Sequence, residues 1–358
     1  MSGGSGIDLN NGISLQWHIT ERCNWNCRHC YRGDIASELP LEKLYAVFLQ
    51  FIRLLDIFGI PRSMARLNLV GGEIFLRDDF LDFLDRISPY NGRYRLKILT
   101  NGSLLNKDVV ARLKAAGVHT LQLSVEGIGE TNDKIRGQGT FSGVLKTIEF
   151  LTASGMSVVV SVTLAQYNFR EIPELIDIFT GMGVMKLGIR RLVPIGNHQK
   201  DLFSGMISPL EQRDFYMMRY NLAKADTRGK QAVYNHLCCE DGIFFQEEGP
   251  AGEYDSPVIP LCGVLSNRIL TVMPNGDVLP CRRLPIVLGN ALESSLVDIW
   301  FSSKVLNNLK DPRRAAPVCK ECKYFSSCRG GARCVSYGYF GTLDAPDPQC
   351  WRLFQQLP

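Results

Sequence analysis

Three cysteines near the amino terminus have a spacing that points to metal chemistry. Cys23, Cys27 and Cys30 form a C-x3-C-x2-C run directly after an apolar segment, Ile13 to Ile19. Three thiols so close together cannot all pair with one another as disulfides, and the run is too tight for a two-knuckle zinc site. Cysteine thiolates are the usual ligands of a [4Fe–4S] cluster. Because such a cluster normally has four protein ligands, a local set of three leaves one iron open to a small molecule. The alternatives are a zinc knuckle and chance clustering.

The remaining cysteines lie far along the chain, which has 12 in all. No export signal is visible, so metal ligation explains them better than a disulfide framework does. Cys238 and Cys239 are vicinal, and each is either a cluster ligand or a small buried apolar residue. The absence of cysteine between Cys30 and Cys238 predicts a scaffold that joins two metal-binding ends. The other seven are Cys262, Cys281, Cys319, Cys322, Cys328, Cys334 and Cys350.

Length and composition exclude several classes of protein. A chain of 358 residues suits two domains, or one large barrel with an appendage. A net charge of +4 is too weak to indicate nucleic acid or an anionic membrane as a partner. No apolar run approaches the roughly 20 residues that span a bilayer. We therefore expect a cytoplasmic protein with neither partner, and we expect residues 1–12, which begin MSGGSG, to be a tag-like, disordered segment.

Strand and helix patterns alternate from residue 13 to about residue 197. Apolar runs such as Val158 to Val160 are typical of parallel strands buried on both faces. A capping box at Ser208 and Glu211 predicts one more helix, ending near Ala225. Period alone does not distinguish a doubly wound open sheet from a partial barrel, but in both the chemistry lies at the carboxyl ends of the strands. The predicted strands are 14–20, 67–70, 96–100, 120–124, 157–164 and 186–193, and the predicted helices are 41–58, 80–87, 107–116, 141–153 and 170–179.

Candidate binding residues follow several of these strands. Glycines such as Gly71 and Gly72 let backbone approach a ligand without an intervening Cβ. A guanidinium such as that of Arg136 matches a carboxylate with two hydrogen bonds. The alternatives are an ordinary turn at Gly71–Glu73 and at Thr100–Gly102, and a surface position for Arg136. The full set of candidates at strand ends is Gly71, Gly72, Glu73, Asn101, Ser124, Arg136 and Pro194.

The cysteine run together with Gly71-Gly72-Glu73 resembles the radical S-adenosylmethionine (SAM) family. The resemblance implies an α/β fold, a partial (β/α)6 TIM-like barrel open on one side. It implies that the open iron binds the amino and carboxylate groups of SAM, and that reduction cleaves SAM to a 5′-deoxyadenosyl radical. Two residues depart from the family pattern, with Glu126 in place of Asp and Asn132 in place of His. The implied SAM contacts are Gly71, Gly72 and Glu73 at the amino group, Asn101, Ser124 at the ribose, Arg136 at the carboxylate, and His29 and Pro194 near the adenine.

The order of the last seven cysteines resembles the SPASM domain, an extension found in radical SAM enzymes that modify peptides and proteins. Tandem zinc ribbons would require two C-x2-C pairs, and only one is present. The resemblance implies two auxiliary clusters and three [4Fe–4S] clusters in total. Cys319, Cys322, Cys328 and Cys350 would hold one auxiliary cluster. Cys262, Cys281 and Cys334 would hold the other, completed by Cys238 or Cys239 or left with an iron open to substrate.

These likenesses divide the chain into a radical SAM barrel (13–230), a linker (231–261) and a SPASM domain (262–358). They imply an enzyme that abstracts hydrogen from a peptide residue and forms a thioether or C–C crosslink in a ribosomally made peptide. The alternatives are a small-molecule dehydrogenase or epimerase, a tetrapyrrole-pathway enzyme and a non-catalytic metal scaffold. The expected partners are a peptide or protein substrate and a flavodoxin- or ferredoxin-type reductant. The short stretch before Cys23 predicts a separate leader-recognition protein.

Arg282 and Arg283 directly follow Cys281, at a place where sulfatase maturases, by resemblance, carry an Asp. This difference argues against a sulfatase maturase. The two arginines are expected either to hold an acidic peptide or to lie on the surface.

Overall fold

A computed structural model describes residues 12–32, 37–196, 199–224, 262–265 and 269–354. Cys238 and Cys239 lie outside these ranges. The described chain forms one nine-stranded sheet in the order β6-β5-β4-β3-β2-β1-β7-β8-β9. Its strands are β1 Ile13–His18, β2 Ala65–Val70, β3 Arg95–Leu99, β4 Thr120–Ser124, β5 Ser157–Leu164, β6 Lys186–Arg191, β7 Ile269–Val272, β8 Asp277–Leu279 and β9 Gly289–Asn290.

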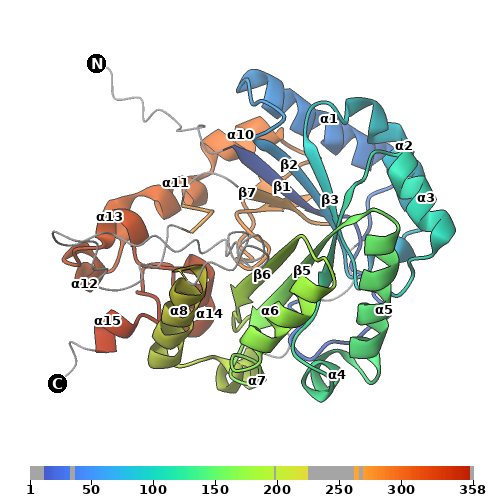
Figure 1. The fold of residues 1–358 in the computed structure, drawn as a ribbon. Helices are drawn as coiled ribbons and strands as arrows, with labels where there is room; N and C mark the ends of the chain where they lie inside the picture. Colours follow the sequence, from blue (N-terminus) through green and yellow to red (C-terminus); the bar gives the residue numbers. More distant parts are fainter. Residues whose placement is uncertain (1–11, 33–36, 197–198, 225–261, 266–268, 355–358) are drawn as a thin grey trace.

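The first six strands are all parallel and follow one another in space as they do in sequence, which confirms the predicted α/β architecture. The order has two ends, β6 and β9, so the sheet formed by the described residues is open, as a partial barrel requires. Figure 1 shows helices α1 to α6 on the outer side of this sheet. The helices that follow β1 to β6 are α1 Leu41–Ile57, α2 Phe80–Ile87, α3 Lys107–Ala115, α4 Glu130–Arg136, α5 Thr140–Ala153, α6 Ile172–Gly181, α7 Gln199–Gly205 and α8 Pro209–Lys224.

The predicted helices and strands are present, with ends that move by a few residues. The capping box before α8 is confirmed, since Ser208 N donates to Glu211 Oε2 (2.7 Å) and Glu211 N donates to Ser208 Oγ (3.2 Å). Helix α4 was not predicted. It is short and ends at Gly137, whose φ of +119° favours glycine.

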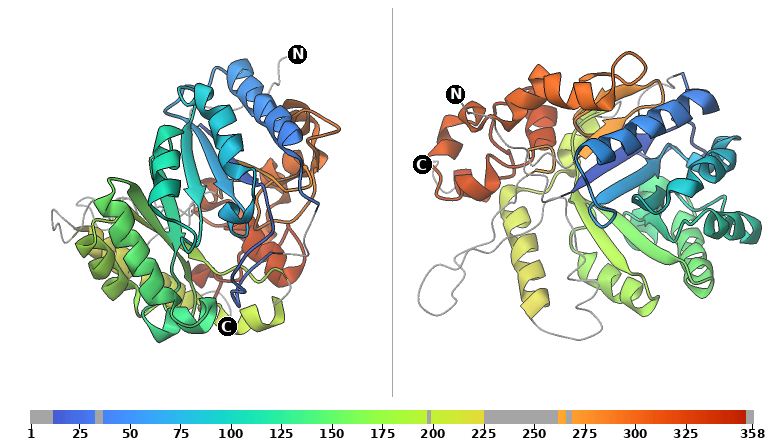
Figure 2. Two further views of the ribbon diagram at one scale, coloured as in Figure 1. Left: turned by 90° about the vertical axis from the view of Figure 1, so that its right-hand side faces the viewer. Right: turned by 90° about the horizontal axis from the view of Figure 1, so that it is seen from above.

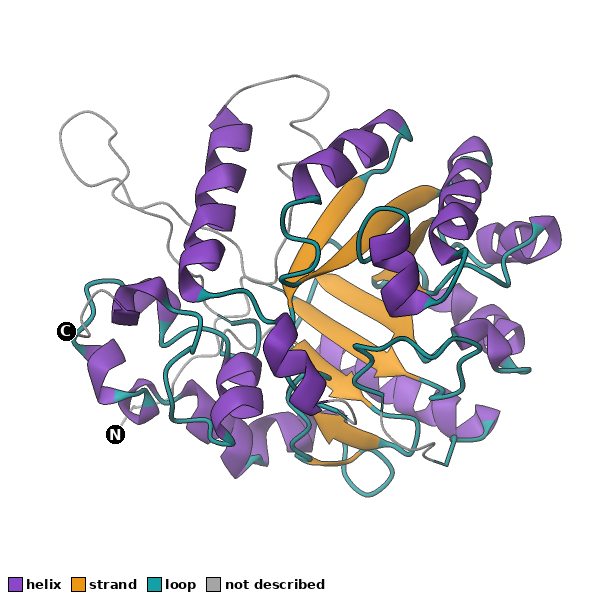
Figure 3. Ribbon diagram, turned by 90° about the horizontal axis from the view of Figure 1, so that it is seen from below, coloured by secondary structure: helices purple, strands orange, loops and turns teal. Residues whose placement is uncertain are grey.

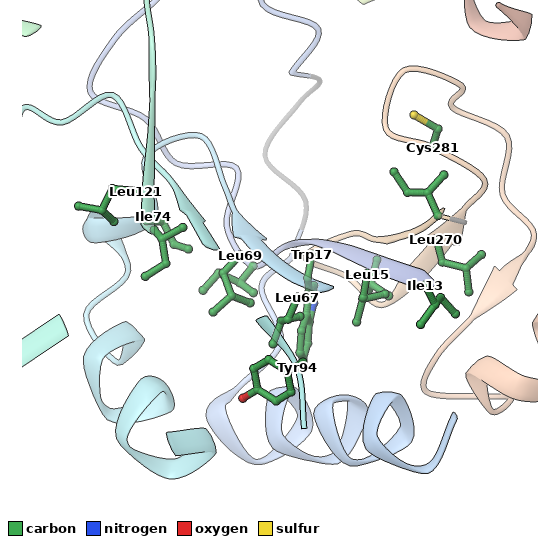
Figure 4. Packing of buried hydrophobic residues seen from close by; sticks show 14 of the residues in the cluster. Ile13, Leu15, Trp17, Leu67, Leu69, Ile74, Tyr94, Leu121, Leu270 and Cys281 are labelled. Atoms are coloured by element: carbon green, nitrogen blue, oxygen red, sulfur yellow. The ribbon is translucent and has the colours of Figure 1, made fainter. Parts of the chain in front are cut away.

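The outer face of the sheet carries the main hydrophobic core. Trp17 on β1 packs edge-on against Phe83 of α2, with ring centroids 5.6 Å apart, and Phe48 of α1 packs against Phe83 and Tyr94. Figure 4 shows Leu15, Trp17 and Tyr94 grouped on the side of the strands where a helix covers them. Helix α1 supports this core because its buried positions recur at helical period.

The inner face of the sheet is polar. Side chains of a strand alternate between its two faces, so the residues between the core positions of β1 point the other way. Gln16 and His18 on β1 line a cavity, as do Gln122 on β4, Ser161 on β5 and Arg190 on β6. A strand-lined space with a polar lining suits a ligand better than it suits a packed barrel core.

The C-terminal segment is continuous with this sheet. Strand β7 pairs in parallel with β1, from Ser14 opposite Ile269 to Trp17 opposite Val272, and β8 and β9 continue it in antiparallel fashion. The sheet therefore crosses the domain boundary that the sequence predicts at residue 262. The remaining helices are α10 Leu296–Ser302, α11 Lys304–Lys310, α12 Pro317–Lys320, α13 Phe325–Cys328, α14 Arg333–Phe340 and α15 Trp351–Phe354.

These C-terminal helices lie beside α8 at the β6 side of the molecule and reach round to α1, as the two views of Figure 2 show. Two polar junctions hold them there. Gln50 of α1 donates to Ala291 O (2.8 Å) and accepts from Leu296 N (3.0 Å). On the other side, Arg191 at the end of β6 pairs with Asp347 (2.9 Å).

Figure 3 shows the same arrangement by element type, with helices flanking the sheet. None of the helices within the described ranges is both long enough and apolar enough to span a membrane.

The junction at Gln50 predicts a stability effect. Replacing Gln50 with Ala removes both hydrogen bonds and leaves a backbone donor and acceptor unpaired, so Gln50→Ala should lower the free energy of unfolding by about 2 kcal/mol. Denaturant unfolding of the anaerobically reconstituted protein measures this change. Gln138→Ala, at an exposed glutamine, is the matched control. Equal midpoints for the two variants would show that the junction does not stabilise the fold.

Candidate functional site

The loop that carries Cys23, Cys27 and Cys30 begins at the carboxyl end of β1 and lies directly on Gly71 and Gly72. Gly72 N donates to Thr20 O (3.0 Å), and Glu73 N donates to Arg22 O (2.7 Å). A Cβ on Gly72 would lie 2.4 Å from Arg22 O, closer than real Cβ contacts come. Glycine is therefore required here so that the cysteine loop can close onto β2.

The three thiols lie close together and partly buried. Burial raises the pKa of Cys27 to about 11, an effect that Arg136 partly offsets, and burial also raises the pKa of Cys23. Both sulfurs are near enough to Cys30 for their charges to interact. A bound metal centre would reverse this balance, because positive charge favours the thiolate. The donor set thus fits an iron–sulfur cluster.

A cavity of about 1400 Å³, measured out to solvent, opens in front of this loop and runs along the inner face of the sheet. Residues of its lining with a buried nitrogen that has no hydrogen-bond partner among the described residues include His29 at Nδ1, Arg136 at Nε and Arg282 at Nε. The guanidinium nitrogens can donate to a bound ligand, and the imidazole nitrogen can donate or accept according to its protonation state. Of the predicted site residues, the cavity lining includes Cys23, Cys27, His29, Cys30, Gly71, Gly72, Asn101, Ser124 and Arg136.

Two predicted SAM contacts lie elsewhere. The Glu73 side chain is buried and accepts hydrogen bonds from Thr100 Oγ1 and Asn101 N, both at 2.7 Å, so it joins β2 to the end of β3. Pro194 is outside the cavity lining, and its carbonyl oxygen is 2.8 Å from where a Cβ on Gly338 would lie. Its neighbour Val193 lines the cavity instead.

Asn101 connects the end of β3 to the cysteine loop. Its Nδ2 donates to Asn24 Oδ1 (2.8 Å), and Asn24 Nδ2 donates to Ser103 Oγ (2.9 Å). Asn24 lies between Cys23 and Cys27 in sequence, so these bonds act directly on the loop. The turn at Thr100–Gly102 therefore holds the cysteine loop in addition to connecting β3 to α3.

A buried ion pair lies beside Cys27. Glu126 accepts a short hydrogen bond from Arg136, and His29 Nε2 lies 3.2 Å from the same oxygen, Glu126 Oε1. Although burial disfavours the charge of Glu126, His29 and Arg136 hold its pKa down to about 2. Arg136 also donates toward Cys27 Sγ (3.8 Å). The Arg136 side chain is only 10% exposed and lies at the site, which corrects the surface alternative.

Arg282 is buried and forms part of the cavity lining. It donates to Glu21 Oε1 (3.2 Å) and to Tyr31 O (3.3 Å), and its guanidinium lies over the Tyr31 ring. Burial raises the pKa of Glu21, and Arg282 and Arg32 offset this only in part. The alternative that Arg282 lies on the surface is thus wrong, while the alternative that it holds an acidic peptide stays a prediction. Arg282 ties the C-terminal segment to the residues on both sides of the cysteine loop.

The C-terminal cysteines form a second centre. Cys319, Cys322, Cys328 and Cys350 all line one cavity of about 920 Å³, measured out to solvent. Burial and the neighbouring Cys350 raise the pKa of Cys319 to about 11, and burial and Asp347 raise that of Cys328 to about 12. The sequence separates these thiols by up to 31 residues, yet the fold brings them to one space, as four ligands of a cluster require.

The other predicted auxiliary ligands that the structure describes do not line this second cavity. Cys281 lines the large cavity near the N-terminal cysteines, next to Arg282. Cys334 is buried on α14, and Cys262 is half-buried. Within the described ranges, no three His, Cys, Asp or Glu side chains converge closely enough to share one metal ion. All ligands of a zinc ion touch that ion at about 2.0–2.3 Å, whereas each cysteine of a cube binds its own iron.

Comparison with known proteins agrees with this geometry. Residues 17–179 match the family model of the radical SAM superfamily, and residues 262–323 match that of the SPASM iron–sulfur cluster-binding domain. The AdoMet-dependent heme synthase of Methanosarcina barkeri is 28% identical over 349 residues, which are 94% of this chain and 95% of that protein. The mycofactocin maturase MftC of Mycolicibacterium smegmatis is 26% identical over 348 residues, 94% of this chain and 82% of that protein.

Among solved structures, SuiB of Streptococcus suis bound to S-adenosylmethionine superposes with a TM-score of 0.70 at 16% identity, covering 97% of this chain and 77% of SuiB. This likeness shows the fold. By the two family models, residues 17–179 form a radical SAM domain and residues 262–323 a SPASM domain near the C-terminal end. The chain is therefore an enzyme, and the non-catalytic scaffold is not supported.

Sequence reasoning missed the two ion pairs of the site. Glu126 and Arg136 are 10 residues apart, and Glu21 and Arg282 are 261 apart. The sequence offered one signal for each ion pair: Glu126 departs from the family motif, and Arg282 directly follows Cys281. Neither signal identifies a partner without the fold.

The pair of Arg282 and Glu21 predicts a nonadditive result. Arg282→Met should destabilise the protein by about 3 kcal/mol because it leaves Glu21 buried without its partner. Adding Glu21→Gln should recover part of that loss, since an uncharged amide needs no counter-charge. Denaturant midpoints of the single and double variants measure the coupling. Strictly additive losses would show that the two side chains do not interact.

The four cysteines of the second cavity predict a pattern of iron loss. Cys319→Ala and Cys350→Ala should each remove about four irons per chain after anaerobic reconstitution, the content of one cube. The double variant should lose no more than either single variant. Combining Cys350→Ala with Cys27→Ala should remove about eight. If the Cys319/Cys350 double variant lost twice as much iron as a single one, the two residues would not share a cluster.

Proposed function

We propose that this chain is a radical SAM maturase that forms a thioether or C–C crosslink in a ribosomally made peptide. The observation that carries the proposal is the large cavity, because Cys281 of the SPASM domain lines it together with Cys23, Cys27 and Cys30. A substrate in this space would lie between the N-terminal cluster and an auxiliary one. When bound, the N-terminal cluster and SAM supply a 5′-deoxyadenosyl radical that removes a hydrogen atom from the substrate.

The residues of the chain would bind and orient the cofactor. Cys23, Cys27 and Cys30 hold the cluster on the platform formed by Gly71 and Gly72. The glycine backbone leaves room for the amino end of SAM. We propose that four further residues of the cavity lining contact SAM: His29, Asn101, Ser124 and Arg136. Val193 takes the adenine-side place that the sequence assigned to Pro194.

The auxiliary clusters would accept the electron that remains after the crosslink forms. We propose three [4Fe–4S] clusters, one of them held by Cys319, Cys322, Cys328 and Cys350. The first auxiliary cluster would use Cys262, Cys281 and Cys334. Cys238 or Cys239 would complete it, or its open iron would bind the thiol of the substrate.

The charge of the cavity supports a substrate that carries carboxylates. Among the described residues of its lining there are six arginines and two glutamates. Three of the arginines pair with carboxylates, Arg136 with Glu126, Arg282 with Glu21 and Arg191 with Asp347. Positive charge in a partly enclosed space attracts anionic ligands. The six arginines are Arg32, Arg136, Arg190, Arg191, Arg282 and Arg283.

A peptide with acidic side chains or a free C-terminus would supply the carboxylates that an arginine-rich cavity favours. The likeness to mycofactocin maturase MftC favours a peptide, and a related fold, SuiB, has been solved bound to its precursor peptide SuiA. With this substrate we propose a flavodoxin- or ferredoxin-type reductant and a separate recognition protein for the peptide leader. We also propose the division into a barrel (13–230), a linker (231–261) and a SPASM domain (262–358).

A tetrapyrrole-pathway enzyme is the second candidate. It is favoured by the match to the heme synthase of M. barkeri, which covers 95% of that protein. An iron porphyrin with free propionates would also satisfy an arginine-rich cavity. The two candidates therefore share the demand for carboxylates and differ in the molecule that supplies them.

One experiment separates the candidates. The reconstituted enzyme is incubated anaerobically with SAM, a low-potential reductant, and either the short peptides encoded beside its gene or an iron porphyrin with free propionates. Peptide maturation predicts 5′-deoxyadenosine release that rises with the peptide, and a peptide lighter by about two hydrogens, since each crosslink removes two. A loss of carboxyl mass from the porphyrin, with no change in any peptide, would overturn the proposal in favour of the second candidate.

A further inference from the structure

Glu126 departs from the family motif, and the structure holds it from every side. Its side chain is 1% exposed. One carboxylate oxygen accepts from Arg136 and lies 3.2 Å from His29 Nε2, and the other accepts from Thr163 N on β5 at 2.7 Å. Burying a carboxylate is costly unless charges and donors surround it. Here each oxygen has a donor, so the charge is retained.

The backbone of Glu126 is fixed as well. Its N–H donates to Asn132 Oδ1 (2.9 Å), and its carbonyl oxygen accepts from Asn168 Nδ2 (2.7 Å). Both asparagines are fully buried. Asn132 is the second residue that departs from the family motif, so the two departures meet at one point. A position constrained in this way is suited to holding other groups in place.

What Glu126 holds is the cysteine loop. Arg136 extends from Glu126 to Cys27 Sγ (3.8 Å), and the residue before it, Ile135, accepts from the backbone N–H of Arg28 (2.9 Å). His29, the other partner of Glu126, directly precedes Cys30. The end of α4 therefore contacts the loop at two places, and Glu126 adds a third contact through His29.

We propose that Glu126 is a positioning residue that fixes Arg136 against the Cys27 sulfur and His29 beside Cys30, and so keeps the cysteine loop in the shape that binds the cluster. The proposal rests on the radical SAM assignment and is independent of the substrate. It differs from direct contact with SAM, which the place of Glu126 in the cavity lining would also allow. Outer contacts of this kind orient metal ligands and typically change metal affinity by 10–100-fold when removed.

The length of the side chain distinguishes the two roles. Aspartate would withdraw the carboxylate by about 1.5 Å, one carbon–carbon bond. From the same backbone position it would lose its reach to Arg136 and His29 together. If Glu126 instead contacts SAM directly, Glu126→Asp should leave iron retention and the spectrum of the cluster unchanged and should weaken SAM binding.

The test uses the full chain, reconstituted anaerobically and free of SAM. Glu126→Gln and Glu126→Asp are compared with Glu171→Gln as the matched control. Glu171 accepts hydrogen bonds from Ile128 N (2.7 Å) and Thr131 Oγ1 (2.6 Å) in the same connecting segment, and these bonds do not involve the cysteine loop. The readouts are the rate at which a chelator removes iron, the electron paramagnetic resonance (EPR) spectrum of the reduced protein, and the affinity for SAM added after these two measurements.

We expect both Glu126 variants to release about four irons at least tenfold faster than the unsubstituted protein. The iron held by the C-terminal cysteines should leave at an unchanged rate, and Glu171→Gln should behave as the unsubstituted protein does. Arg136→Lys is a second variant for the case in which Glu126→Gln does not fold. It retains the ion pair but lacks the fork that reaches both Glu126 and Cys27, so it should show the same selective iron loss.

Two results would overturn the inference. One is a Glu126→Asp variant with normal iron retention and normal EPR but weaker SAM binding, which would identify direct contact with SAM. The other is iron release that matches the control in all variants at both positions. Failure of the unsubstituted protein to bind a cluster would instead overturn the proposed function, so the two failures are distinguishable.

Discussion

The close approach of the cysteine loop to Gly71 and Gly72 is the contact on which the site depends. The loop backbone at Thr20 and Arg22 accepts hydrogen bonds from the residues at the end of β2, and no side chain fits between the two segments. This contact directs the loop across the carboxyl ends of the strands, where polar side chains of the inner face also point. A cluster bound there would lie at the mouth of the cavity, close to the place where a ligand can enter.

The rest of the fold limits how this loop can move. Asn101 holds it from the end of β3, Arg136 holds it from α4, and Arg282 holds its flanks from the C-terminal segment. The last contact makes the SPASM segment a structural part of the first site as well as a carrier of its own cysteines. The pairing of β7 with β1 likewise makes the C-terminal segment part of the sheet that carries the first site.

Buried charge in this site contributes to specific geometry more than to net stability. A buried ion pair often stabilises a fold no more than apolar residues of the same size would. Burial still raises the pKa of Glu21 despite its arginine neighbours, which indicates that the charge there is retained at a cost. What such pairs provide is direction, because a guanidinium and a carboxylate favour one relative orientation. A cluster loop that has to keep three thiols facing one point benefits from that direction.

Much of the fold and of the site could be predicted from the sequence, because the patterns that indicate them lie within short stretches of the chain. The parallel strands follow from apolar runs such as that at Val158, and the first cysteine set is visible because its members are close in sequence. The cavity shared by Cys319 and Cys350 also agrees with the predicted grouping. Local pattern could not show that Glu73 faces β3, that Pro194 faces α14, or that Arg282 is buried, because each depends on segments that meet only after folding. Helix α4 is short, and its place is set by contacts with the loop more than by helical period.

The most direct measurement is the EPR spectrum of the anaerobically reduced protein before and after SAM is added, with metal content determined on the same sample. The account predicts iron and sulfide in cluster proportions and a spectrum that SAM alters, accompanied by release of 5′-deoxyadenosine. Zinc in place of iron, or a cluster signal that SAM leaves unchanged, would contradict it.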